Sequence, residues 1–216
     1  MKILVFIILF FSDFAFFSLK VFAGPMVQIP EGPFLMGEIL AEEGVNGKTV
    51  KLPSFQIDQF EVTNQEFQGE FPFHHFPLGA EKHPVCHVTW EEANVYCERL
   101  GKRLPSEAQW EKAARGTDGR IFPWGIKKKR RGAHPPISGM TKRIVGFNKK
   151  DVSVYGVRDM SASVWEWVKD EGLNERRVAK GGVWNEHLDY EYSKTFDRIF
   201  IDPDKRFIFL GFRCVK

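Results

Sequence analysis

Residues 101–111 read GKRLPSEAQWE, and this stretch contains the clearest local structure signals in the chain. Ser106 and Gln109 form a capping box, in which two side chains satisfy backbone amides at the start of a helix. We therefore expect a helix that begins after Ser106 and ends at Gly116. Gly101 suits the position just after a preceding helix, because glycine adopts the left-handed conformation without a steric penalty. The stretch thus predicts a tight connection between two helices.

Two further capping boxes lie upstream and predict two more helices. Thr63 and Thr89 are each followed three residues later by Glu, the spacing that a capping box requires. The first of these helices is expected to end at Gly69. The second is expected to run through Leu100, so that it is the helix that Gly101 closes.

Short apolar stretches separated by Gly and Pro predict strands near the beginning of the chain. Residues 26–37 are expected to form a strand, a turn and a second strand. Residues 51–62 are expected to form another pair of strands. The candidate core residues of this second pair are Phe55, Ile57 and Phe60.

The second half of the chain predicts fewer regular elements. Alternation in the sequence VWEW places Trp165 and Trp167 on one face of a strand and Glu166 on the other. Residues 178–184, with a bend at the paired glycines, and residues 207–215 are expected to form two further strands. The few helices, short strands and many Gly and Trp residues predict an α+β fold with much irregular backbone.

The N-terminus has the layout of a secretory signal peptide. Lys2 is followed by the unbroken apolar run 3–11, and a small residue, Ala23, stands before Gly and Pro. We expect cleavage after Ala23, which divides the chain into a signal peptide (1–23) and one domain (24–216). The predicted location is periplasmic or secreted, with no membrane span after cleavage. Retention of the signal as a membrane anchor is the alternative that remains open.

The charge of the chain does not indicate a nucleic-acid-binding protein. The formal net charge is only +3, which gives no general attraction to a polyanion. Residues 127–131 form a local basic run without the interleaved aromatics that stack on bases. This run is interpreted as a solvated surface loop, with an acidic partner as the alternative.

Several ordered motifs resemble one known family. They are MVQIPEGPFLMG (26–37), FEVTN (60–64), GKRLPSEAQWE (101–111), FPWG (122–125), YGVRDM (155–160), VWEW (164–167), GG (181–182) and LGFR (210–213). Their order and spacing resemble the formylglycine-generating enzyme (sulfatase-modifying factor) family from about residue 26 to residue 215. The resemblance implies a variant of the C-type-lectin-like fold, rich in irregular backbone and often stabilised by calcium.

The resemblance also implies a disulfide bond between Cys97 and Cys214. This bond would close a loop of about 117 residues, for which the chain-entropy model gives a stabilisation of nearly 5 kcal/mol. Cys86 is the third cysteine of the chain. It is interpreted as a small buried apolar residue, with a metal site shared with His83 and His87 as the alternative.

The residues that perform catalysis in the family are replaced here. Its enzymes use oxygen and copper(I) to oxidise a cysteine of a sulfatase to formylglycine. The copper is bound by two cysteines that lie shortly after the Gly-Gly motif in the sequence. An ungapped reading places Glu186 and Glu191 at those positions. Copper(I) prefers thiolates to hard carboxylates, so copper is not expected. The prediction is a non-catalytic exported protein that binds a ligand or acts as an accessory factor. The alternative is a sulfatase-modifying oxidoreductase that converts a substrate cysteine to formylglycine.

The segment after the paired glycines is the expected binding cleft. Its aromatic and acidic side chains suit a protein, peptide or glycan ligand. Its carboxylates and histidine form either a site for a hard, iron-type or zinc-type metal or the solvated rim of the cleft. The expected cleft residues are Trp184, Glu186, His187, Tyr190 and Glu191.

Calcium is the cofactor that the resemblance implies, and Glu166 and Ser163 are its candidate ligands. The family usually has Gly-Asn where this chain has Ala162 and Ser163. A serine hydroxyl is a poorer calcium ligand than an asparagine carbonyl. Glu166 is either a calcium ligand or a structural acid satisfied by backbone donors.

Overall fold

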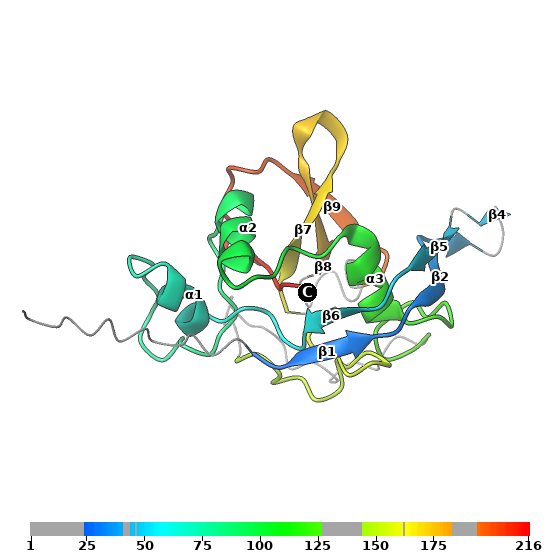
Figure 1. The fold of residues 1–216 in the computed structure, drawn as a ribbon, viewed down its shortest axis with the longest axis horizontal. Helices are drawn as coiled ribbons and strands as arrows, with labels where there is room; N and C mark the ends of the chain where they lie inside the picture. Colours follow the sequence, from blue (N-terminus) through cyan, green and yellow to red (C-terminus); the bar gives the residue numbers. More distant parts are fainter. Residues whose placement is uncertain (1–23, 41–43, 46, 127–143, 162, 183–193) are drawn as a thin grey trace, which may run out of the picture.

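The fold was analysed in a computed structural model, which describes residues 24–40, 44–45, 47–126, 144–161, 163–182 and 194–216. Within these residues, helices and short strands alternate with long stretches of irregular backbone. Figure 1 shows two helices flanking a central sheet, while a third helix lies at one end of the long axis of the molecule. The predicted α+β class, with much irregular backbone, is confirmed.

The helices begin where the capping boxes predict. They are α1 (Asn64–Glu70), α2 (Trp90–Arg99) and α3 (Glu107–Arg115), and each N-cap side chain accepts a hydrogen bond from the third helical amide. The expected end of α1 at Gly69 is wrong by one residue. The helix continues because Phe67 is buried in the core and its carbonyl accepts a hydrogen bond from the amide of Phe71, at 2.9 Å.

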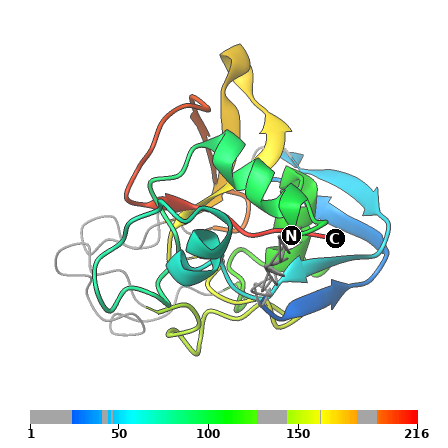
Figure 2. The ribbon, with the colours of Figure 1, turned by 60° about the vertical axis from the view of Figure 1, so that its left-hand side comes forward.

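The central sheet has four strands in the order β10-β7-β8-β9. They are β7 (Trp165–Glu171), β8 (Arg177–Gly181), β9 (Arg198–Ile201) and β10 (Leu210–Gly211). Only β10 is parallel to its neighbour. The β7–β8 hairpin turns through a short 3₁₀ segment, η1 (Leu173–Glu175), and projects from the body of the molecule in both ribbon views (Figures 1 and 2).

The N-terminal strands form three small antiparallel pairs. β1 (Met26–Ile29) pairs with β6 (Phe55–Asp58), β2 (Gly32–Met36) with β5 (Lys48–Leu52), and β3 (Ile39–Leu40) with β4 (Gly44–Val45). The strand, turn and strand expected in residues 26–37 are therefore present, but β1 and β2 each pair with a later strand.

The single strand expected in residues 207–215 is not formed. Leu210 and Gly211 pair with β7, after which the backbone partners change along the segment. The carbonyl of Phe212 accepts from the amide of Val62, that of Cys214 from Asp58, and Val215 exchanges hydrogen bonds with Arg103. The segment is extended but crosses several elements, so no single ladder forms.

The apolar interior consists of two clusters on opposite sides of β7. Trp165 and Trp167 contribute to the cluster under α1 and α2, while Val168 belongs to the cluster under α3. Phe55 and Ile57 are buried as predicted, whereas Phe60 is only partly buried. β7 is thus covered on both faces along Trp165–Val168, the part of the strand whose residues are all buried.

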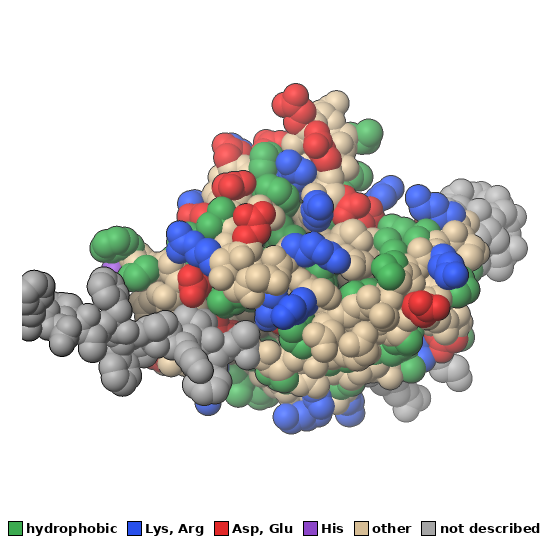
Figure 3. Space-filling model, in the orientation of Figure 1, with side chains coloured by type: hydrophobic (Ala, Val, Ile, Leu, Met, Phe, Trp, Pro, Cys, Tyr) green, Lys and Arg blue, Asp and Glu red, His purple; other side chains and the backbone are tan. Residues whose placement is uncertain are grey.

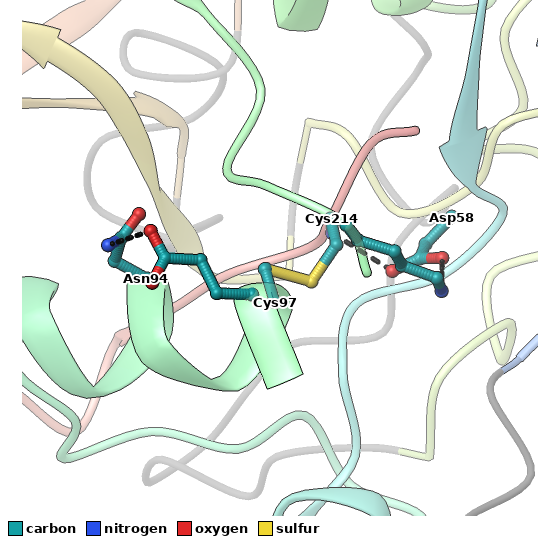
Figure 4. Close-up of a disulfide and its surroundings, with 6 residues drawn as sticks. Asp58, Asn94, Cys97 and Cys214 are labelled. Atoms are coloured by element: carbon teal, nitrogen blue, oxygen red, sulfur yellow. Dashed lines mark hydrogen bonds and ion pairs between the residues drawn. A yellow bond between two sulfur atoms is a disulfide. The ribbon is translucent and has the colours of Figure 1, made fainter. Parts of the chain in front are cut away.

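The predicted disulfide bond is present. Cys97 of α2 and Cys214 lie 2.01 Å apart at their sulfur atoms, and both side chains are fully buried (Figure 4). The amide of Cys214 also donates to Oδ2 of Asp58, at 2.9 Å, and Lys102 pairs with the other oxygen of that carboxylate, at 2.6 Å. The bond therefore fixes the C-terminal segment between α2 and β6. Cys86 is buried, as expected for a small apolar side chain.

Candidate functional site

The predicted cleft lies outside the described residues. They end at residue 182 and resume at residue 194. The predicted cleft residues that fall between them are Trp184, Glu186, His187, Tyr190 and Glu191. The structure does describe both ends of this segment and the residues that fix them in place.

The first end is fixed by the glycine bend. Gly181 has φ +98°, and a Cβ there would lie 3.1 Å from the carbonyl oxygen of Val164 and 3.4 Å from the ring of Trp110. A side chain would therefore be strained by its backbone conformation and crowded by its neighbours. Trp110 belongs to the GKRLPSEAQWE stretch, so this stretch also helps to fix the backbone just before the predicted cleft segment.

A buried ionic network lies directly before the bend. The amine of Lys180, fully buried, is 3.1 Å from Oε2 of Glu111 and 3.6 Å from Oε1 of Glu107. Arg115 pairs with the other oxygen of Glu111, at 2.9 Å, and Arg198 contacts Glu107, at 3.3 Å. The network joins α3 to β8 and β9, and it was not predicted from the sequence.

The second end of the segment is fixed beside the FPWG motif. The amide of Thr195 donates to the carbonyl of Ile121, at 2.8 Å, and its hydroxyl contacts the same oxygen at 3.1 Å. The rings of Phe122 and Trp124 follow directly and stack with centroids 5.1 Å apart. An aromatic pair thus lies close in sequence to Ile121, the residue that binds Thr195 just after the predicted cleft segment.

Glu166 lies at the centre of a second buried network. Its Oε2 accepts from Nε of Arg213, at 2.7 Å, and from the indole of Trp110, at 2.8 Å. Its Oε1 accepts from Nη2 of Arg213, also at 2.7 Å. The guanidinium further donates to the carbonyls of Gln59 and Arg158. Glu166 is therefore a structural acid in this arrangement, with side-chain donors in place of the backbone donors expected.

These contacts do not fit a calcium ion bound by Glu166. Both of its oxygens accept short hydrogen bonds, and a guanidinium occupies the side from which a cation would approach. Among the residues that the structure describes, no three Asp, Glu, His or Cys side chains are grouped to hold a metal. Calcium binding by Glu166 and Ser163 stays a prediction that the local geometry does not favour.

Two further carboxylates border this network. Burial raises the pKa of Glu61 well above its ordinary value, and the negative charge of Asp159 is the second cause. Arg213, 4.0 Å away, acts in the opposite direction and lowers this pKa. Neither oxygen of Glu61 has a hydrogen bond of good geometry among the described residues. The Ser163 hydroxyl lowers the pKa of Glu61, but by less than burial raises it. Burial also raises the pKa of Asp159 to about 6. One guanidinium therefore faces three carboxylates.

We expect stability to fall as the pH rises from about 4 to 8. Asp159 has a folded pKa of about 6, above the unfolded value of about 4, so its contribution is complete below pH 4 and is lost as the pH rises past 6. The shift corresponds to at most about 3 kcal/mol. Urea unfolding of the parent and of Asp159→Asn across this range measures it.

The asparagine variant is a close match for the parent because asparagine tolerates the positive φ of residue 159 (φ 60°). It can also keep the acceptor that the amide of Gly146 uses. Its stability should depend less on pH. Parallel profiles for the two proteins would contradict the assignment.

The fold, the glycine bend beside Trp110 and the motif-bearing loops define a domain of the formylglycine-generating-enzyme type, a variant of the C-type-lectin-like fold. The family model of the sulfatase-modifying factor enzyme 1-like domain matches residues 18–72 and 74–216. The chain belongs to this family.

Similar proteins include active and inactive members. The mouse formylglycine-generating enzyme is 34% identical over 167 residues, which cover 63% of this chain and 45% of the mouse protein. The aligned part is therefore less than half of that enzyme. The bovine inactive C-alpha-formylglycine-generating enzyme 2 is 28% identical over 262 residues, covering 88% of this chain and 87% of the relative.

Solved structures agree on the fold. PvdO from Pseudomonas aeruginosa superposes with a TM-score of 0.72 at 22% identity, covering 92% of this chain and 95% of PvdO. CarF superposes with a TM-score of 0.66 at 20% identity, covering 89% of this chain and 97% of CarF. At these identities the likeness concerns architecture alone.

Proposed function

We propose that this chain is an exported, non-catalytic member of its family that binds a protein, peptide or glycan, or acts as an accessory factor. The observation that supports this proposal most directly is the pair Glu186 and Glu191, which an ungapped reading of the sequence places where the family's enzymes have copper-binding cysteines. Carboxylates neither favour copper(I) nor form a disulfide with a substrate thiol. The resemblance to a relative named as inactive is in accord with this reading.

The ligand site is proposed in the segment between the two fixed ends described above. Lys180 and Gly181 fix one end against α3, and Thr195 fixes the other beside the stacked rings of Phe122 and Trp124. A binding segment held at both ends by a rigid framework is typical of protein recognition loops. Its aromatic and acidic side chains would provide stacking surfaces and hydrogen-bond acceptors for a sugar or a cationic peptide.

Export is supported by the apolar run 3–11 and the small residue Ala23. The disulfide bond is also typical of proteins that fold in an oxidising compartment. Within the described residues, no helix has the length and apolar character needed to cross a bilayer. Edman sequencing of protein recovered from the exporting cell tests the proposed cleavage, with Gly24 expected as the new first residue.

A sulfatase-modifying oxidoreductase is the second candidate, favoured by the 34% identity to the mouse enzyme. We expect the purified protein, supplied with copper and oxygen, to yield no formylglycine from a sulfatase-type cysteine peptide, because the thiolate pair is replaced. Mass spectrometry of the peptide measures the product, and an active formylglycine-generating enzyme serves as positive control. A formylglycine product from this chain would establish the second candidate and refute the first.

Ligand binding is tested by cross-linking and affinity capture from the exporting cell, followed by glycan-array and peptide-array measurements. The matched variant is Trp184→Ala with Glu186→Gln. Loss of capture in this variant, with an unchanged urea midpoint, is expected. Capture that is equal for the parent and the variant would contradict a ligand site in this segment.

A further inference from the structure

The loop after α1 exposes two bulky apolar side chains. Phe73 is 91% exposed and Leu78 is 100% exposed, and both lie in residues 72–79. Single exposed apolar residues are common on protein surfaces. Two almost completely exposed ones within eight residues are less expected, because the fold buries almost none of either side chain.

The loop is nevertheless held firmly against α1. The side-chain amide of Gln68 donates to the carbonyl of His74, at 2.9 Å, and the ring of His74 packs edge-on against Phe67, with centroids 5.0 Å apart. At the end of the loop the side-chain amide of Asn64 donates to the carbonyl of Ala80, at 2.8 Å. The loop therefore presents its two apolar tips from a fixed frame, which reduces the entropy lost on binding.

The same helix lies where the N-terminal segment joins the domain. A Cβ on Gly24 would be 3.3 Å from Oε1 of Glu66 in α1. The sequence before Gly24 contains the apolar run 3–11. Figure 1 places α1 at one end of the long axis of the molecule, and Figure 3 shows apolar side chains gathered at that end, next to a histidine.

We propose that loop 72–79 contacts a lipid bilayer, with Phe73 and Leu78 inserted among the lipid headgroups. Until the expected cleavage after Ala23, a chain that enters its domain at α1 from an apolar export segment holds this end of the molecule at the membrane. Apolar side chains held at such an interface reach about 5–10 Å into the boundary between headgroups and acyl chains. The β7–β8 hairpin, whose tip carries Leu173, projects in a different direction and stays in water.

The test uses the protein expected after cleavage, residues 24–216, mixed with phosphatidylcholine vesicles, so that the apolar run 3–11 cannot itself hold the domain at the bilayer. Three variants, Phe73→Cys, Leu78→Cys and Leu173→Cys, are labelled with an environment-sensitive dye, and the parent protein measures any labelling of the buried Cys86. Leu173 is the matched control because it is a 71% exposed apolar residue on another part of the surface. Since all three positions are exposed, the substitutions should leave the fold intact, which near-ultraviolet circular dichroism checks.

Brominated acyl chains in the vesicles should quench most of the emission from positions 73 and 78 and little from position 173. Equal quenching at all three positions, or none, would overturn the proposal. Sedimentation of the same samples without vesicles tests the alternative that the loop binds a second copy of the chain. Self-association that depends on concentration and is abolished by Phe73→Ser with Leu78→Ser would assign the loop to a second copy of the chain, which also overturns it.

Discussion

Replacing Arg213 with methionine is expected to lower the free energy of unfolding by about 3–5 kcal/mol, because it leaves buried carboxylates without their counter-charge. Arg213 binds Glu166 through two hydrogen bonds of 2.7 Å and is fully buried. Domains of this size are stable by about 5–15 kcal/mol. The variant should therefore unfold at far lower urea concentration and be cleaved readily by proteases.

A double variant separates the ion pair from other effects. Glu166→Gln combined with Arg213→Met should be less destabilised than the two single changes together predict, because each removes the charge that the other leaves unpaired. Arg176→Ala is the surface control. Arg176 pairs with Asp202 at 3.0 Å, but both are about half exposed, so the change should cost less than about 1 kcal/mol. An unchanged urea midpoint for Arg213→Met would refute the central role assigned to this pair.

Loss of the disulfide bond should be the other large effect. The bond joins residues separated by 117 positions, and removal of a native disulfide typically costs about 2–5 kcal/mol. We expect Cys97→Ala with Cys214→Ala to unfold at a correspondingly lower urea concentration. Tryptophan fluorescence is a suitable signal because Trp110 and Trp167 are fully buried.

Reductant provides the matched control for this prediction. Dithiothreitol in the urea series should shift the parent towards the double alanine variant and leave the variant itself unchanged. Cys86 is present in both proteins, so any effect of its thiol cancels. A parent midpoint that is identical with and without reductant, under conditions in which mass spectrometry shows the bond to be open, would contradict the expected contribution.

The helices were predictable because their signals are local. Thr63, Thr89 and Ser106 each cap a helix together with a side chain three residues later, and all three capping boxes are formed. The disulfide was predictable only through the resemblance, because the pairing of three cysteines is not determined by their spacing. Local patterns also placed β1 and β2 but did not reveal their partners, which lie further along the chain.

The partners within the buried ionic networks could not be predicted from the sequence. Glu61, Lys180 and Arg213 each stand within an apolar motif, FEV, VAKGG and LGFRCV. A charged residue flanked by apolar residues indicates a buried charge with a partner, so the burial of these three side chains could have been predicted. The partner itself is set by tertiary packing, as with the 3.1 Å contact between Lys180 and Glu111, which are 69 positions apart. The cleft residues lie outside the described structure, so their predicted role stands untested.

The placement of the last seven residues has a consequence for how the protein is made. Arg213 completes the central ion pair, Cys214 closes the disulfide, and the backbone of Lys216 exchanges hydrogen bonds with Gln56. These contacts reach back to Glu166, Cys97 and Gln56, so they form only once residues 213–216 have been synthesised. The domain therefore lacks its central ion pair and its disulfide bond until this segment is in place, so its folding depends on contacts that are distant in the sequence. A substitution within residues 213–216 would thus weaken the attachment of this segment to α2, β6 and β7 at the same time.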